Sequence, residues 1–119
     1  MLYIHSSGGD GDIANAIVDY IENCGKKISI VVFGRCESAA TYIVKACHKR
    51  YALKRSIFMF HLPELTNKRI LNKFRQNKKL NLHIDICKRL FHDVLEVNNK
   101  LQVFTAQEVK NMGLIDEII

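Results

Sequence analysis

Ser38 and His61 are the two residues whose types and positions could support nucleophilic catalysis. Ser38 follows an apolar, largely β-branched run at residues 28–33 and comes just before apolar residues with helical spacing. A serine at such a strand-to-helix turn has an exposed hydroxyl beside the free N–H groups of the helix. These groups could stabilise the oxyanion that forms when the hydroxyl attacks a carbonyl. Capping of the helix is the alternative role of a serine at this place.

His61 is the candidate general base. It follows the apolar run at residues 57–60, and Pro63 disfavours helix just before it, so His61 is expected at the end of a strand. If that strand neighbours the one before Ser38, the imidazole could take the serine proton and return it to a leaving amine. Gly8-Gly9 and the N–H of Ala39 could then hold the oxyanion. The alternative for a lone histidine at a strand end is a structural role.

A strand–helix–strand unit must position these residues. Residues 2–4 are a short apolar run, and the loop at residues 6–12 is rich in glycine. Apolar residues then recur at helical spacing, with Asp12 as the expected cap and Gly25 as the expected end. The short crossover to the strand at residues 28–33 predicts a parallel sheet. Its loops meet at one rim, so the diglycine should face Ser38.

The rest of the chain supplies further elements. A helix is expected from about Ser38 to Cys47, and one long basic helix, or two abutting ones, at residues 66–97. The basic face is interpreted as solvated, with a surface for an acidic partner or nucleic acid as the alternative. Thr105 and Glu108 form a capping-box pattern for a short helix that Gly113 ends.

Composition limits the class of protein. The 119 residues predict a single domain over 1–119, and the net charge of +6 is concentrated at residues 68–89. No apolar run of membrane-spanning length occurs, and the amino terminus does not look like a signal peptide. Four cysteines without Cys-x-x-Cys spacing argue against zinc and for reduced thiols in a cytosol-like compartment.

Four stretches of the chain occur together in an order typical of one family. They are LYIHSSGGD at residues 2–10, GRCESAA at 34–40, MFHLP at 59–63 and FTAQEVKNMGLID at 104–116. Together they resemble the proteolytic subunit of the Clp ATP-dependent protease, a serine endopeptidase. The resemblance covers most of the chain except the basic helix.

The resemblance implies an α/β fold of the Clp/crotonase type, with ββα units, a parallel sheet and a long handle helix. It implies Ser38 as nucleophile, His61 as general base, and the N–H groups of Gly9 and Ala39 as oxyanion hole. It also implies a ring of subunits, heptameric in the family, in the cytoplasm or in the matrix or stroma of an organelle. An AAA+ unfoldase feeds unfolded proteins into such a ring and spends the ATP, so the subunit itself needs no cofactor or metal.

Several positions depart from the family pattern. The family's catalytic aspartate lies four residues before Thr105, where this chain has Leu101; Asp93 or Glu96 could substitute only if the preceding loop folds differently. Glu37 stands beside Ser38 where the family has a small residue. The segment after Pro63 is shorter than in the family, and the family's amino-terminal part, with its axial pore, is missing from this sequence.

These observations leave three hypotheses. The first is an active or weakened Clp-type endopeptidase that uses a Ser38–His61 dyad. The second is a non-catalytic subunit of a mixed ring, suggested by Leu101 and Glu37. The third is a crotonase-type acyl-CoA enzyme, which is disfavoured because the sequence shows no separate nucleotide-binding signature.

Overall fold

The central element is strand β2 (Ser29–Glu37), which leads directly to Ser38. The structure is a computed structural model, and it describes residues 1–60 and 102–119. β2 pairs in parallel with β1 (Leu2–Ser6), β3 (Lys49–Ala52) and β4 (Ile57–Phe60). The predicted parallel strand–helix–strand unit is therefore confirmed: helix α1 (Gly11–Asn23) connects β1 to β2.

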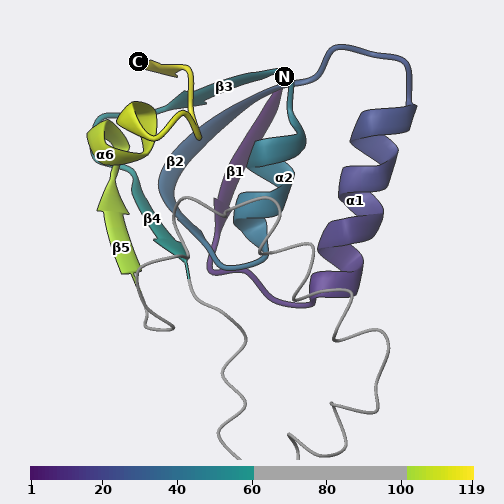
Figure 1. Cartoon of the computed structure of the whole chain (residues 1–119), viewed down its shortest axis with the longest axis horizontal. Helices are drawn as coiled ribbons and strands as arrows, with labels where there is room; N and C mark the ends of the chain where they lie inside the picture. Colours follow the sequence, from purple (N-terminus) through teal and green to yellow (C-terminus); the bar gives the residue numbers. More distant parts are fainter. Residues whose placement is uncertain (61–101) are drawn as a thin grey trace, which may run out of the picture. The chain divides into compact units, whose positions relative to one another are not determined.

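The remaining elements complete a mixed α/β arrangement around one sheet (Figure 1). Helix α2 (Ala40–Ala46) follows β2, and the C-terminal part contains β5 (Gln102–Thr105), α6 (Ala106–Asn111) and β6 (Glu117–Ile118). The strand order is β5-β4-β2-β3-β6, with β1 beside β2 off this path. Only the β4–β5 pair is antiparallel among the described strands.

The prediction that the central strand stops at Gly34 is wrong. β2 continues to Glu37, and Gly34 is a bend inside it, with a φ of 77°. Residues before the bend pair with β3, from Ser29 to Val32, and residues after it pair with β4, from Arg35. Glycine suits this position because a positive φ carries no steric cost for it. The bend thus lets one strand serve two neighbours and aims its end away from β3.

Ser56 closes the gap where β2 changes neighbours. Its hydroxyl donates to the Val32 carbonyl at 2.9 Å, and the Leu53 N–H donates to the same oxygen at 2.9 Å. Ser56 is only 2% exposed, so its hydroxyl must have a partner. The Val32 carbonyl, which lies where the pairing with β3 ends, is therefore hydrogen-bonded by protein groups and needs no water.

The N-cap of helix α1 lies two residues earlier than the sequence suggested. The cap is Asp10 rather than Asp12: Asp10 Oδ1 accepts from the N–H groups of Asp12 and Ile13 at 2.8 and 3.3 Å. Both aspartates suit a cap, and the extended ψ of 119° at Asp10 decides between them. The predicted end is confirmed, because Gly25 follows the C-cap with a φ of 69°.

The C-terminal elements follow the sequence prediction closely. Thr105 caps α6 in a full capping box with Glu108, and Gly113 lies just beyond the helix with a φ of 79°. Hydrogen bonds from Thr105 lower the pKa of the Glu108 carboxyl. The core gathers side chains from all these elements, the largest fully buried ones being Phe58, Ile30, Ile115, Val32, Val44 and Val109.

Arg50 and Asp116 fasten the C-terminal segment to β3. Asp116 Oδ1 lies 2.7 Å from Arg50 Nη2, its Oδ2 accepts from the Arg50 backbone N–H at 2.8 Å, and the Asp116 N–H donates to the Arg50 carbonyl at 2.8 Å. The hydrogen bond from the Arg50 side chain is the main reason that the pKa of Asp116 is lowered. A lowered carboxyl pKa means that the folded state binds the ionised form more strongly than the unfolded state does.

We expect Asp116→Asn to lower the free energy of unfolding at pH 7 by about 1 kcal/mol, since one charge-assisted bond is lost at a partly exposed site. The contribution is present above the ordinary aspartate pKa and is lost as pH falls through the lower folded pKa. Urea unfolding at pH 7 and pH 3 measures it. Asp19→Asn, on the exposed face of α1, is the control. A difference that does not shrink at pH 3 would contradict the role of the ion pair.

Some expectations concern other parts of the chain. The long basic helix at residues 66–97 lies outside the described residues. Within residues 1–60 and 102–119, no helix has the length and apolar character needed to cross a membrane. The described residues form one compact unit.

Candidate active site

Ser38 occupies a sharp turn between β2 and α2. Its φ is 52°, and it is the one non-glycine residue with a positive φ in the described part of the chain. The Ser38 N–H donates to the Met59 carbonyl at 2.8 Å, and its own carbonyl accepts from the Thr41 hydroxyl at 2.6 Å and the Thr41 N–H at 3.0 Å. The strained conformation is thus held by hydrogen bonds on both sides, from Met59 and from Thr41.

Ser38 is not a helix cap, so that interpretation is wrong. Helix α2 begins at Ala40, two residues after Ser38, and its N-cap is Ala39, which makes no side-chain cap hydrogen bond. Within residues 1–60 and 102–119, no group forms a hydrogen bond with the Ser38 hydroxyl. A strained serine whose hydroxyl does no capping is typical of a nucleophile on a strand-to-helix elbow.

The glycine-rich loop after β1 packs directly against this elbow, as predicted. A methyl group at Gly8 would come within 2.7 Å of the Glu37 carbonyl oxygen, 2.8 Å of Ser38 Cβ and 3.2 Å of the Ala39 nitrogen. Gly8 and Gly9 have φ values of 90° and 145°, which side chains rarely allow. The loop therefore needs glycine both for its backbone shape and for its close approach to Ser38.

Gly9 and Ala39 border one cavity of about 280 Å³. Neither backbone N–H has a hydrogen-bond acceptor among the residues that the structure describes. Apolar side chains from the two neighbouring helices make up much of the rest of the wall, namely Ile13, Ala14, Ile17, Ala40 and Ile43. The site therefore places two free N–H donors beside an apolar pocket. This arrangement suits the carbonyl group of a residue whose side chain is apolar.

Helix α1 is less deeply buried than its apolar pattern suggested. Ala14 and Ile21 are buried, whereas Ile13 and Tyr20 are 62% and 69% exposed. α1 and α2 lie side by side (Figure 1), and Ile13 and Ile17 face the cavity between them. Part of the apolar stripe thus lines a cavity instead of the core.

The residues just before Ser38 carry charge but no second nucleophile. Glu37 Oε1 lies 3.6 Å from Arg35 Nε, and the Glu37 side chain is 15% exposed. Burial, and then the charge of Glu37, raises the pKa of the Cys36 thiol to about 12. Because Cys36 is completely buried and stays protonated, it cannot compete with Ser38 as a nucleophile.

The other predicted site residues lie outside the described residues. These are the general base His61, Leu101 at the expected acid position, and the two substitutes Asp93 and Glu96. The structure therefore brings together Ser38, Ala39 and the Gly8-Gly9 loop, and the pairing of Ser38 with His61 stays a prediction.

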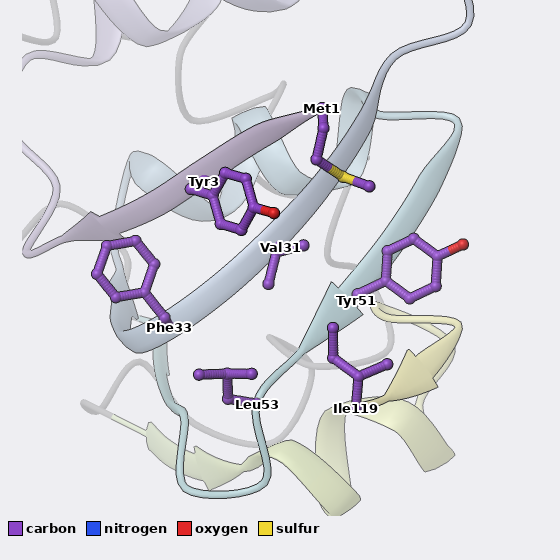
Figure 2. Close-up of a pocket in the computed structure, with 7 residues that line it drawn as sticks. All are labelled: Met1, Tyr3, Val31, Phe33, Tyr51, Leu53 and Ile119. Carbon is purple, nitrogen blue, oxygen red and sulfur yellow. The ribbon is translucent and has the colours of Figure 1, made fainter.

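A second apolar surface lies on the sheet, away from α1 and α2. Figure 2 shows its side chains. They line a cup with a volume of about 500 Å³. They come from β1, β2 and β3, from the residues next to β1 and β3, and from the C-terminal residue: Met1, Tyr3, Val31, Phe33, Tyr51, Leu53 and Ile119. Tyr3 and Ile119 are 70% and 59% exposed.

Comparison with known proteins identifies one family for the chain. The family model described as Clp protease matches residues 1–119. The chain belongs to the Clp protease family. Its curated relatives in the family include ATP-dependent Clp protease proteolytic subunit 2 of Frankia casuarinae, which is 30% identical over 99% of this chain and 59% of its own length.

Two further relatives are similar at about the same level. Proteolytic subunit 2 of Prochlorococcus marinus is 29% identical over 99% of this chain and 64% of its own length. Proteolytic subunit 2 of Cutibacterium acnes is 27% identical over 98% of this chain and 60% of its own length. The chain thus spans about three fifths of the length of these members of the Clp protease family.

The structure adds residues that sequence reasoning missed. The pocket walls include side chains of α1 and α2, whose spacing in the sequence indicated only that helices form there. His5 lies against the bend at Gly34. The only signal for this contact in the sequence was the predicted parallel pairing of the first two strands. Such a contact depends on the register of the two strands, which the sequence does not specify.

Proposed function

We propose that this chain is the proteolytic subunit of a Clp-type serine endopeptidase, with Ser38 as the nucleophile. The observation that carries the proposal is the strained Ser38 elbow packed against the diglycine loop. Family membership supports a serine peptidase chemistry for this elbow. The free N–H groups of Gly9 and Ala39 support an oxyanion hole beside it.

The proposed reaction follows from these groups. His61 takes the hydroxyl proton while Ser38 Oγ bonds to the peptide carbonyl carbon, and the N–H groups of Gly9 and Ala39 hold the resulting oxyanion. The C–N bond then breaks, His61 gives its proton to the leaving amine, and water hydrolyses the acyl-enzyme. With Leu101 in the place of the orienting acid, we expect a dyad that is weaker by up to about 10⁴-fold than a complete triad.

The pocket between α1 and α2 suggests the side chain that precedes the cleaved bond. Its wall is formed largely by aliphatic side chains and small residues, and its cavity of about 280 Å³ is large enough for a Leu- or Met-sized group. Unfolded chains expose such side chains, so they are the substrate class that we propose. No cofactor or metal of the subunit's own enters this scheme.

The assembly is also part of the proposal. We propose a ring of subunits, heptameric as in the family, that receives chains from an AAA+ unfoldase which spends the ATP, in the cytoplasm or an organelle's matrix or stroma. The exposed apolar cup in Figure 2 supports contact with another protein, because a surface lined by Tyr3, Phe33 and Leu53 gains by burial. Members of a mixed ring would share this surface even if they had lost activity.

Labelling with a fluorophosphonate tests the proposal. We expect the probe to bond to Ser38, as peptide mapping by mass spectrometry would show, because an activated serine attacks phosphorus as it attacks a carbonyl. Ser38→Ala should lose the label, and Ser7→Ala, in the nearby exposed loop, should keep it. Absence of label on assembled protein would favour the non-catalytic ring subunit instead, and equal labelling of Ser38→Ala would show that Ser38 is not the nucleophile.

A further inference from the structure

His5 fills a gap in the pairing of β1 with β2. Ile4 pairs with Val32 and Ser6 pairs with Cys36, so three residues of β2 lie opposite His5 alone. This irregularity contains the bend at Gly34. Backbone groups at such a bulge lose their regular ladder partners. The bulge is exposed, so either water or a nearby side chain takes the place of the missing β1 backbone groups.

The imidazole of His5 takes the place of a missing β1 backbone group. Its Nδ1 accepts a hydrogen bond from the Arg35 backbone N–H at 3.1 Å, and it lies 3.1 Å from the Phe33 carbonyl oxygen. The tautomer that carries its proton on Nε2 accepts this bond at Nδ1, whereas the other tautomer would donate its Nδ1–H to the Phe33 carbonyl instead. The ring also lies against Phe33, with centroids 5.7 Å apart.

Gly34 leaves the space that His5 occupies. A Cβ atom at Gly34 would overlap His5 Nδ1 and come within 2.9 Å of Cε1. The glycine thus serves two purposes: it permits a φ of 77°, and it admits the imidazole to the backbone of β2. His5 and Gly34 form one unit, and this unit lies at the start of the three residues that lead to Ser38.

We propose that His5 is a positioning residue for the Ser38 nucleophile, an inference that rests on the proposed peptidase function. By holding the Arg35 amide, it sets the direction in which residues 35–37 leave the bend and pair with β4. The Ser38 N–H donates to the carbonyl of Met59, which is also in β4. The direction of residues 35–37 therefore decides where the Ser38 hydroxyl lies. Small errors in the position of a nucleophile cost rate rather than binding.

The test compares three variants of the full chain in its assembled form. His5→Leu keeps an apolar body but has no acceptor. His5→Asn keeps an acceptor, Oδ1, at the same bond distance from the backbone as Nδ1. His5→Gln moves the acceptor one bond further out. It replaces His5→Leu in the comparison with His5→Asn if the leucine variant does not fold.

We expect the maximal rate of fluorophosphonate labelling in His5→Leu to fall about tenfold, since this is the effect of losing one orienting hydrogen bond. The concentration of probe at half-maximal rate should not change, because the pocket is intact. His5→Asn should restore the rate. Hydrogen exchange of the Arg35 amide should be faster in His5→Leu and close to the wild type in His5→Asn.

Three results would overturn the inference: a wild-type labelling rate in His5→Leu, a loss of rate in His5→Asn equal to that in His5→Leu, or an Arg35 amide that exchanges equally in all variants. A wild type that does not label at all refutes the proposed function separately. In that case the exchange of the Arg35 amide still decides whether His5 holds the bend.

Discussion

Ser38→Gly is expected to abolish fluorophosphonate labelling and, at the same time, to make the protein more stable than Ser38→Ala. Both variants lack the hydroxyl, so both should lose the covalent reaction, with a fall in peptide turnover of about 10⁴-fold or more. They differ in the backbone. Ser38 has a φ of 52°, and a residue with a Cβ atom costs about 1–2 kcal/mol in this left-handed region.

Glycine removes that cost, although it also gives the unfolded chain more freedom. We expect the free energy of unfolding of Ser38→Gly to exceed that of Ser38→Ala by about 1 kcal/mol as the balance of these effects. Urea unfolding of the two variants under identical conditions measures the difference. Equal stability would mean that the elbow carries no strain, and labelling of either variant would mean that the nucleophile is elsewhere.

At Ser38, the backbone conformation that the turn requires conflicts with the side chain that the chemistry requires. A glycine would satisfy the turn better, but it would supply no hydroxyl. The carbonyl of Ser38 accepts hydrogen bonds from Thr41 and its N–H donates to Met59, so these neighbours hold the unfavourable conformation in place. Such conflicts between local preference and observed structure are expected at functional positions.

Features set by local chemistry could be predicted from the sequence. The capping box of Thr105 and Glu108 and the helix end at Gly25 depend on residues close in the chain, and the structure confirms both. The approach of the diglycine loop to Ser38 was predictable too, because the carboxyl ends of parallel strands share one rim. These features require only the order and type of the elements.

Features set by long-range pairing could not be predicted in this way. Gly34 was interpreted as the end of a strand because glycine often ends one, yet β2 passes through it to reach a second neighbour. That outcome depends on β3 ending at Ala52 and on Ser56 bridging to Val32, which no local pattern around Gly34 encodes. The contact of His5 with Arg35 arises from the same bend, so it was missed for the same reason.

Gly8→Ala is expected to have the largest combined effect on stability and labelling. The new methyl group would meet the Glu37 carbonyl oxygen at 2.7 Å and Ser38 Cβ at 2.8 Å, and the φ of 90° would be strained as well. We expect a loss of about 3 kcal/mol in the free energy of unfolding, from overpacking and the left-handed backbone together. Labelling of the molecules that remain folded should fall about 100-fold, since a displacement of about 1 Å can have that effect.

Gly113→Ala is the matched control. Gly113 has a similar φ of 79°, but a Cβ atom there would meet nothing within 4 Å. This variant should therefore lose about 1 kcal/mol through backbone strain alone and label at the wild-type rate. The difference between the two variants isolates the contact of the loop with the elbow. Equal losses of stability in both, or normal labelling of folded Gly8→Ala, would show that the close packing of Gly8 against Ser38 does not support the nucleophile.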